Sequence, residues 1–78
     1  MDETRIAVIP ENTREDLIVR LCEMHGKPMV NLRVFAANAN GDLVPTKKGI
    51  AVRPELLDEV IKALQAAMVS AKAGGLLL

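Results

Sequence analysis

The sequence predicts an α+β domain in which four antiparallel strands are followed by one long helix. Residues 17–24 and 29–36 alternate between apolar and polar side chains, which predicts two paired strands, and the Asn-Gly dipeptide at 40–41 predicts a second hairpin. Beyond Pro54, apolar residues recur every three or four positions, as in an amphipathic helix. A length of 78 residues leaves room for one domain.

The first two predicted strands each have two distinct faces. In 17–24 the faces are Leu17, Val19 and Leu21 on one side and Ile18, Arg20 and Cys22 on the other. We expect a polar connection over residues 25–28, where Gly26 permits unusual backbone angles and Pro28 lacks a ladder donor. In 29–36, Asn31, Arg33 and Phe35 share a mixed face, which we expect to be open to solvent or to a ligand.

The third strand is predicted to be short or to lie on an edge, and the fourth to be brief. Residues 43–44 lead to Pro45, which cannot donate to a ladder and therefore indicates a short strand or an edge strand. The Pro-Thr-Lys-Lys-Gly loop (45–49) then precedes a brief strand at 50–53. A further short strand at 6–9, closed by Pro10, is expected near the N-terminus.

The helix has clear start and stop signals. Pro54 suits the first helical position, acidic residues follow in the early turns, and Gly74-Gly75 is a stop. Its apolar stripe consists of Leu57, Ile61, Leu64, Met68 and Ala71, widened by Leu56 and Val60. This stripe is wider than one small sheet face needs, so we predict a homodimer in which helices also pack together; a monomer is the alternative. The apolar tail 76–78 is either frayed or packed on a neighbour.

The charge is balanced in total but not along the chain. Residues 1–16 hold five acidic and two basic residues (net −3), residues 17–53 six basic and two acidic (net +4), and residues 54–78 three acidic and two basic (net −1). A zero total argues against a nucleic-acid partner, whereas the central excess argues for one. The alternative is that these cations are ordinary solvated surface.

Chemistry-bearing residues are few. The single Cys22 and single His25 fall far short of a metal site, no phosphate-binding glycine motif occurs, and His25 is expected in a solvated turn. We therefore expect a protein that is not an enzyme, with no metal, no cofactor and no small-molecule substrate. The charged start and the lack of long apolar runs predict no secretory signal and no membrane association. We expect a cytoplasmic protein, associated with the nucleoid if it is bacterial.

The stretch from Asn31 to Leu57 resembles a known family. A Leu32-Arg33-Val34-Phe35 strand, an Asn40-Gly41-Asp42 turn, the run Pro45-Thr46-Lys47-Lys48-Gly49-Ile50-Ala51-Val52 and a Pro54-Glu55-Leu56-Leu57 helix start occur in this order. They are similar to the motifs of the single-stranded-DNA-binding transcriptional coactivators called positive cofactor four. The likeness covers roughly residues 12–67.

The resemblance implies a homodimer of curved four-stranded sheets with central helices, and basic channels for single-stranded or melted DNA. It places Lys27, Arg33, Lys47 and Lys48 on the DNA backbone, with Gly49 permitting a tight exit from the loop. Arg20 and Arg53 are added from alternation and charge alone. Leu57, Ile61, Leu64 and Met68 are the expected dimer contacts, and transcription machinery is an expected partner.

Several aromatic positions of the family are empty in this chain. Ala36, Met24 and Leu57 stand where the family commonly has aromatic residues, and Val44 replaces a basic one. Phe35 remains the one aromatic residue; it either stacks on a base or packs at the dimer interface. Binding should therefore rest mainly on phosphates and fall steeply with salt.

Three functions stay open at this point. The first is a dimeric single-stranded-DNA-binding coactivator, the second a protein-interaction module of the same fold, and the third an RNA-binding protein. We divide the chain into an acidic segment (1–11), the nucleic-acid-binding domain (12–73) and the tail (74–78). Residues 1–16, with their net charge of −3, are expected to compete for the basic channel, so that deleting residues 1–10 tightens binding at low salt.

Overall fold

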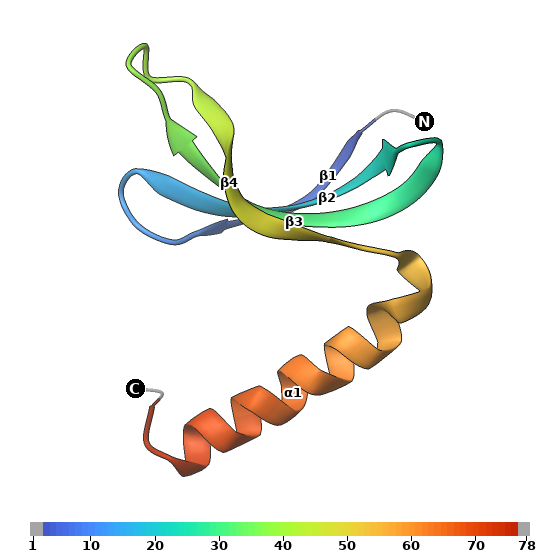
Figure 1. The fold of residues 1–78 in the computed structure, drawn as a ribbon. Coiled ribbons are helices and arrows are strands. Elements are labelled where there is room, and N and C mark those ends of the chain that lie inside the picture. The colour runs from blue at the N-terminus through green and yellow to red at the C-terminus, as the bar shows by residue number, and fades with distance from the viewer. Residues whose placement is uncertain (1–2, 77–78) are drawn as a thin grey trace.

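In the computed structural model, which describes residues 3–76, four antiparallel strands form one curved sheet and a long helix leads away from it (Figure 1). The strands are β1 (Thr4–Pro10), β2 (Glu15–Met24), β3 (Lys27–Ala37) and β4 (Leu43–Val52), in the spatial order β1-β2-β3-β4. A short 3₁₀ turn, η1 (Pro54–Leu56), precedes the helix α1 (Leu57–Ala73). The predicted α+β class and element order are confirmed.

The composition of the sheet differs from the prediction in two strands. The expected short strand at 6–9 lies within β1, which pairs with β2 and joins the N-terminal segment to the sheet. The predicted strands at 43–44 and 50–53 are the two ends of one strand, β4. The prediction of a loop between them is wrong. Pro45 does not interrupt β4 because β4 is an edge strand, where one side of the backbone needs no partner.

The hairpin turns follow their sequence signals. His25 and Gly26 both have positive φ, 54° and 77°, which is the signature of a two-residue type I′ turn between the paired Met24 and Lys27. The connection is therefore shorter than the expected 25–28, and Pro28 lies inside β3. In the second turn, the Asn38 side-chain oxygen accepts hydrogen bonds from the backbone N–H groups of Asn40 and Asp42.

The helix begins and ends as its sequence signals predict, apart from its first turn. Pro54 opens the 3₁₀ turn η1, and the α-helix proper starts at Leu57. At the other end, Gly75 has φ 71°, and the N–H groups of Gly75 and Leu76 donate to the carbonyl oxygens of Lys72 and Ala71. This is a Schellman motif. Leu76 is 77% exposed, and the remaining tail residues lie outside the described part of the chain.

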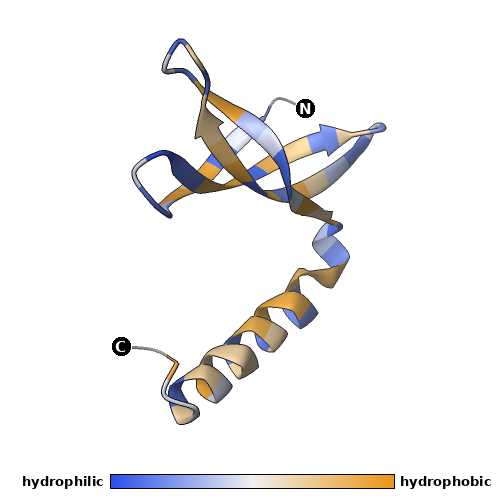
Figure 2. Ribbon diagram, turned by 60° about the vertical axis from the view of Figure 1, so that its left-hand side comes forward, coloured by the Kyte–Doolittle hydropathy of each residue, from blue (hydrophilic) through white to orange (hydrophobic). Residues whose placement is uncertain are grey.

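The helix α1 lies on one side of the sheet without being buried against it. Hydrophobic residues run along α1 beside hydrophilic ones (Figure 2), yet no residue of α1 is buried. The buried residues are instead Ile18, Asn31, Phe35 and Val52, all in the sheet. Between residues 3 and 76 there is no helix of the length and apolar character that a membrane span requires.

Candidate nucleic-acid interface

Polar and basic side chains gather on the face of the sheet that is turned away from α1. We call it the arginine face and define it by Arg5, Arg20, Asn31 and Arg33. Arg5 pairs with Arg20, and Arg20 with Asn31, across three neighbouring strands. Because paired residues point to the same side of a sheet and residues two apart share a face, Arg33 belongs to this face as well.

The side chain of Asn31 joins two of the predicted binding residues. Its Oδ1 accepts a hydrogen bond from Nη2 of Arg20 at 2.9 Å and another from Nε of Arg33 at 3.2 Å. Asn31 is only 4% exposed, so this shared acceptor is shielded from water. A buried hydrogen bond to a charged group restricts the side chains that make it, and the two guanidinium groups are thereby held close together.

The ring of Phe35 lies beneath arginine side chains. The Cζ atoms of Arg20 and Arg5 lie 4.9 Å and 5.6 Å from its centroid, within the range of cation–π interaction. Phe35 is 4% exposed, so the structure places it under the two arginines rather than at an open surface. A base would reach this ring only after an arginine moves. The face also points away from α1, the element expected at the dimer interface.

A bulge in β4 presents the two predicted lysines. Arg33 pairs with Gly49 and Phe35 with Pro45, so Val34 alone lies opposite residues 46–48. Thr46 holds this bulge: its Oγ1 donates to the Val34 carbonyl oxygen at 2.7 Å and accepts from the Lys48 N–H at 3.2 Å. Arg33 Nη1 donates to the Thr46 carbonyl oxygen at 3.0 Å. The bulge therefore links the exposed Lys47 and Lys48 to the arginine face.

Gly49 is required by a close approach rather than by an unusual backbone angle. A Cβ at this position would lie 2.4 Å from the Leu32 carbonyl oxygen and 2.8 Å from Cα of Arg33. Both atoms belong to the backbone of β3 and cannot move aside cheaply. The expected role of Gly49 at the exit of a loop is thus replaced by a role in pressing β4 against β3, opposite Arg33.

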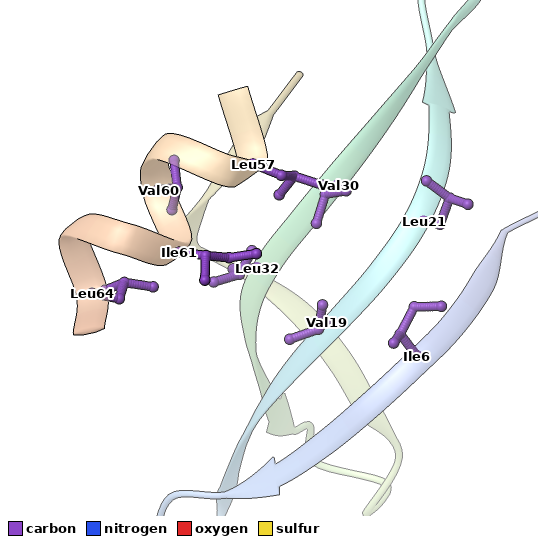
Figure 3. Close-up of a pocket in the computed structure, with 9 residues that line it drawn as sticks. All are labelled: Ile6, Val19, Leu21, Val30, Leu32, Leu57, Val60, Ile61 and Leu64. Carbon is purple, nitrogen blue, oxygen red and sulfur yellow. The ribbon is translucent and has the colours of Figure 1, made fainter. Parts of the chain in front are cut away.

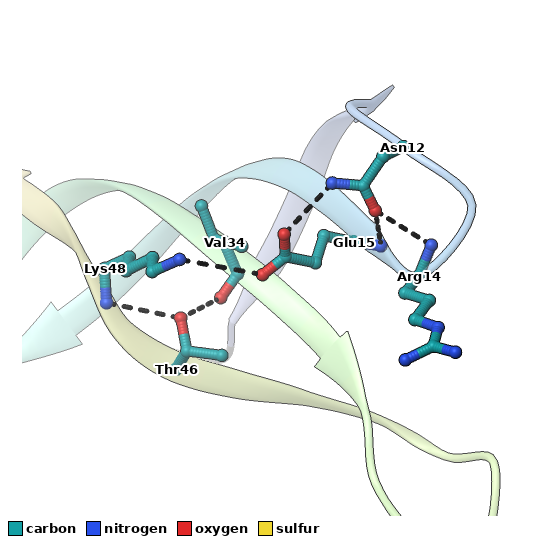
Figure 4. A network of polar contacts seen from close by, with 6 residues as sticks. All are labelled: Asn12, Arg14, Glu15, Val34, Thr46 and Lys48. Carbon is teal, nitrogen blue, oxygen red and sulfur yellow. Dashed lines mark hydrogen bonds and ion pairs between the residues drawn. The ribbon is translucent and has the colours of Figure 1, made fainter.

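Two carboxylates lie against these cations. Glu3 Oε1 accepts a hydrogen bond from Nη1 of Arg20, whose side chain is 12% exposed. Glu15 Oε2 lies 4.0 Å from Nζ of Lys48, while its other oxygen accepts from the Asn12 side chain at 3.0 Å (Figure 4). Lys48 remains 75% exposed, so a ligand phosphate has access to its ammonium group.

The other two predicted cations form a separate group. Lys27 and Arg53 are exposed and line a hollow of about 180 Å³ with Pro28, Met29 and Glu55. This hollow lies where β3 begins and β4 ends. The structure thus divides the six predicted residues into a central group, Arg20, Arg33, Lys47 and Lys48, and an end group, Lys27 and Arg53.

Several residues of this site are not predicted by the sequence pattern. Asn31 was placed on the mixed face but carries no charge, and Thr46 was counted as part of a loop. Arg5 was counted within the acidic segment, although it lies opposite Arg20. The signal for Asn31 was present in the alternation of β3, whereas the signal for Arg5 is a pairing between strands that no local pattern contains.

An open apolar cleft separates α1 from the other face of the sheet. Its volume is about 460 Å³, and it is lined only by apolar residues: Ile6, Val19, Leu21, Val30, Leu32, Leu57, Val60, Ile61 and Leu64 (Figure 3). Three of the four predicted dimer contacts lie here. Ile61, Leu64 and Met68 are 51%, 58% and 49% exposed, so about half of each side chain is left uncovered by residues 3–76.

The described residues contain no group of three or more His, Cys, Asp or Glu side chains arranged to hold a metal ion. Cys22 is a free, half-buried thiol. His25 lies in the type I′ turn between β2 and β3 and is exposed.

Comparison with solved structures gives close matches to PC4 (positive cofactor four) homologues. The protein BPSL1147 from Burkholderia pseudomallei, a PC4 homolog, is 31% identical in sequence, with a TM-score of 0.78 over 86% of this chain and 90% of that chain. Its tetragonal crystal form gives a TM-score of 0.79 over 98% of that chain. A bacteriophage T5 homolog of the eukaryotic coactivator PC4, implicated in recombination-dependent DNA replication, shares the fold at 19% identity, with a TM-score of 0.65 over 99% of this chain and 85% of that chain.

The sequence itself carries the family's pattern. No curated protein sequence gives a significant match. The family model described as "Transcriptional Coactivator p15 (PC4)" matches residues 14–63, a span that includes β2, β3, β4 and the start of α1. With this match and the structural likeness at 31% identity, the chain belongs to the PC4 family of transcriptional coactivators.

Proposed function

We propose that this protein is a non-enzymatic binder of single-stranded or locally melted DNA that works as a homodimer in transcription. Family membership supports the class of function. The observation that carries the proposal is the network through Asn31 and Thr46, which holds Arg20 and Arg33 on one face beside the bulge with Lys47 and Lys48. Fixed guanidinium groups suit phosphates because they lose little freedom on binding.

Contacts to phosphates account for most of the proposed affinity. Of the central cations, Lys47 and Lys48 are exposed and Arg33 is half-buried, whereas Arg20 is 12% exposed and contributes mainly through its charge. Lys27 with Arg53 offers a second point of contact at the end of the sheet. A backbone-tracking groove of this kind binds any sequence, with affinity that depends strongly on salt. We expect a log-log salt slope of roughly −0.7 for each phosphate neutralised on a single strand.

The apolar cleft supports the homodimer. The stripe on α1 and the cleft beside it belong to the same chain, so a two-fold axis lets each helix cover the surface that the other exposes. Apolar side chains exposed to this extent on a small domain favour association. We propose Leu57, Ile61, Leu64 and Met68 as the contacts, as the periodicity predicts.

Titration of a labelled oligo-dT at low salt, followed by fluorescence anisotropy, tests the proposed function. Replacing both Lys47 and Lys48 by Ala should weaken binding by about tenfold or more and make the salt slope shallower by up to about 1.4, two phosphates' worth. The matched control is the double replacement of Lys62 and Lys72 by Ala, which removes the same charge from α1. The control should bind as the wild type does.

Three results would contradict the proposal. They are no binding in the micromolar range, equal loss in both double variants, and tighter binding of an oligo-U of the same length, which would favour RNA. The open cleft favours a second candidate, a protein-interaction module that uses α1. Pull-down from nuclease-treated lysate separates the two, because partners of that module survive the nuclease.

A further inference from the structure

Arg5, on the edge strand β1, is the least engaged cation of the arginine face. It is exposed, and no other residue in 3–76 makes a hydrogen bond or ion pair with its guanidinium group. Its Cζ lies 5.6 Å from the centroid of the Phe35 ring, within the range of cation–π interaction. The same ring lies under Arg20, which pairs with Arg5 across the sheet.

We propose that the guanidinium plane of Arg5 is a stacking site for a nucleobase of single-stranded nucleic acid, with Phe35 as its support. A planar guanidinium group stacks on nucleobases as it does on aromatic side chains. The inference rests on the proposed function and adds the site at which bases, rather than phosphates, are held. It also gives the only aromatic residue of the chain a role that does not require its exposure.

Arg20 is the natural comparison, and its surroundings suit it less for this role. Its Nη1 donates to Glu3, its Nη2 donates to Asn31, and its side chain is 12% exposed. Arg20 therefore shares the support of Phe35 but has little open surface for a base. Arg5 has the same support and is exposed, so the stacking site is assigned to Arg5.

The substitution Arg5→Lys tests the site, since lysine keeps the charge and loses the plane. Affinities are measured for oligo-dT and for an oligomer of the same length whose sugars carry no bases. The variant should bind oligo-dT about tenfold more weakly, in the range of one stacked base. It should bind the abasic oligomer as tightly as the wild type does, with an unchanged salt slope.

Arg14→Lys is the matched control, because Arg14 is an exposed arginine of the neighbouring turn and is not part of the arginine face. It should leave both affinities unchanged, and urea unfolding should show equal stability for both variants. Equal losses of Arg5→Lys on the two oligomers, or no loss on oligo-dT, would overturn the stacking site while leaving the proposed function in place. A wild-type protein that binds neither oligomer overturns both.

Discussion

On the arginine face, Asn31 and Phe35 are each 4% exposed and Ile18 is fully buried, whereas the face toward α1 is lined by apolar residues and holds an open cleft of about 460 Å³. The face richer in charge is thus the more completely packed one. A single-layer sheet buries side chains on one face only by curving around them, and here the long arginine side chains cover Phe35.

The difference indicates which face of the sheet has its side chains covered within one chain. Buried polar groups are stable when they are hydrogen-bonded, and Asn31 meets this condition with its two arginines. Apolar surface left in water costs about 25 cal/mol per Å², and no residue of α1 is fully buried. We therefore assign a ligand to the arginine face and a second copy of the chain to the cleft.

The largest expected effect is on the cleft. Leu64→Asp places a carboxylate at the centre of the proposed dimer contact, twice per dimer. Desolvating each carboxylate costs several kcal/mol, so self-association should weaken by about 1,000-fold or more. Sedimentation equilibrium over a range of protein concentrations measures this as a shift from dimer to monomer.

The control for this substitution lies on the same helix. Val69→Asp introduces the same residue at a position that is 66% exposed and lies beside the polar side chains of α1, outside the stripe. Valine and aspartate have similar helix propensities, so Val69→Asp costs a few tenths of a kcal/mol less in propensity than Leu64→Asp, which is small beside the expected effect on the dimer. It should leave the dimer intact. A wild-type protein that is monomeric at all concentrations, or equal dissociation by both variants, would contradict the assignment of a second copy to the cleft.

A smaller effect is expected on the arginine face. Asn31→Leu keeps the volume but removes the acceptor shared by Arg20 and Arg33, leaving donors unpaired at a buried site. The free energy of unfolding should fall by about 1–3 kcal/mol, measured by urea denaturation. Oligo-dT binding should weaken as well, because the two guanidinium groups are no longer held together.

Asn31→Asp is the control that distinguishes the effect of losing the acceptor from the effect of changing the side chain. It keeps an oxygen acceptor between the two arginines and should therefore retain the stability of the wild type. If Asn31→Leu is as stable as Asn31→Asp, then Asn31 does not organise the arginine face. The tight packing of this face would then need another cause.

Local patterns predicted the elements whose signals are local. Alternation located β2 and β3 to within a few residues, and Pro54 with Gly74-Gly75 bounded the helical region. β4 was read as two strands because Pro45 and Gly49 are turn signals in sequence. In the structure, Pro45 does not break β4 because β4 is an edge strand. The strand continues across its bulge because the Thr46 hydroxyl donates a hydrogen bond to the Val34 carbonyl oxygen.

Charge is the signal by which the sequence indicates candidate binding residues. It predicts Arg20, Arg33, Lys47 and Lys48, and the hydrogen bonds of Asn31 and Thr46 bring these four into one part of the sheet. That they bind a ligand stays a prediction. Arg5 and Glu3 were treated as parts of an acidic segment, since their relation to Arg20 and Phe35 arises only when β1 pairs with β2. Counting charge by segment therefore located the basic region but not its supports.

The smallest expected effect concerns Glu3, whose carboxylate forms an ion pair with the guanidinium group of Arg20. Deleting residues 1–10 is not a clean test of competition by the acidic segment, because the deletion also removes β1 and Arg5.

Glu3→Gln removes the charge alone. Glu3 is 47% exposed, so solvent screens the pair from that side and we expect it to contribute about 1 kcal/mol or less. Oligo-dT should therefore bind up to about fivefold more tightly at low salt, with the difference fading as salt rises. Glu11→Gln, an equal change of charge at an exposed residue with no ion pair among the described residues, should have less effect. Equal tightening by both would mean that the net charge of the segment matters and that the contact with Arg20 does not.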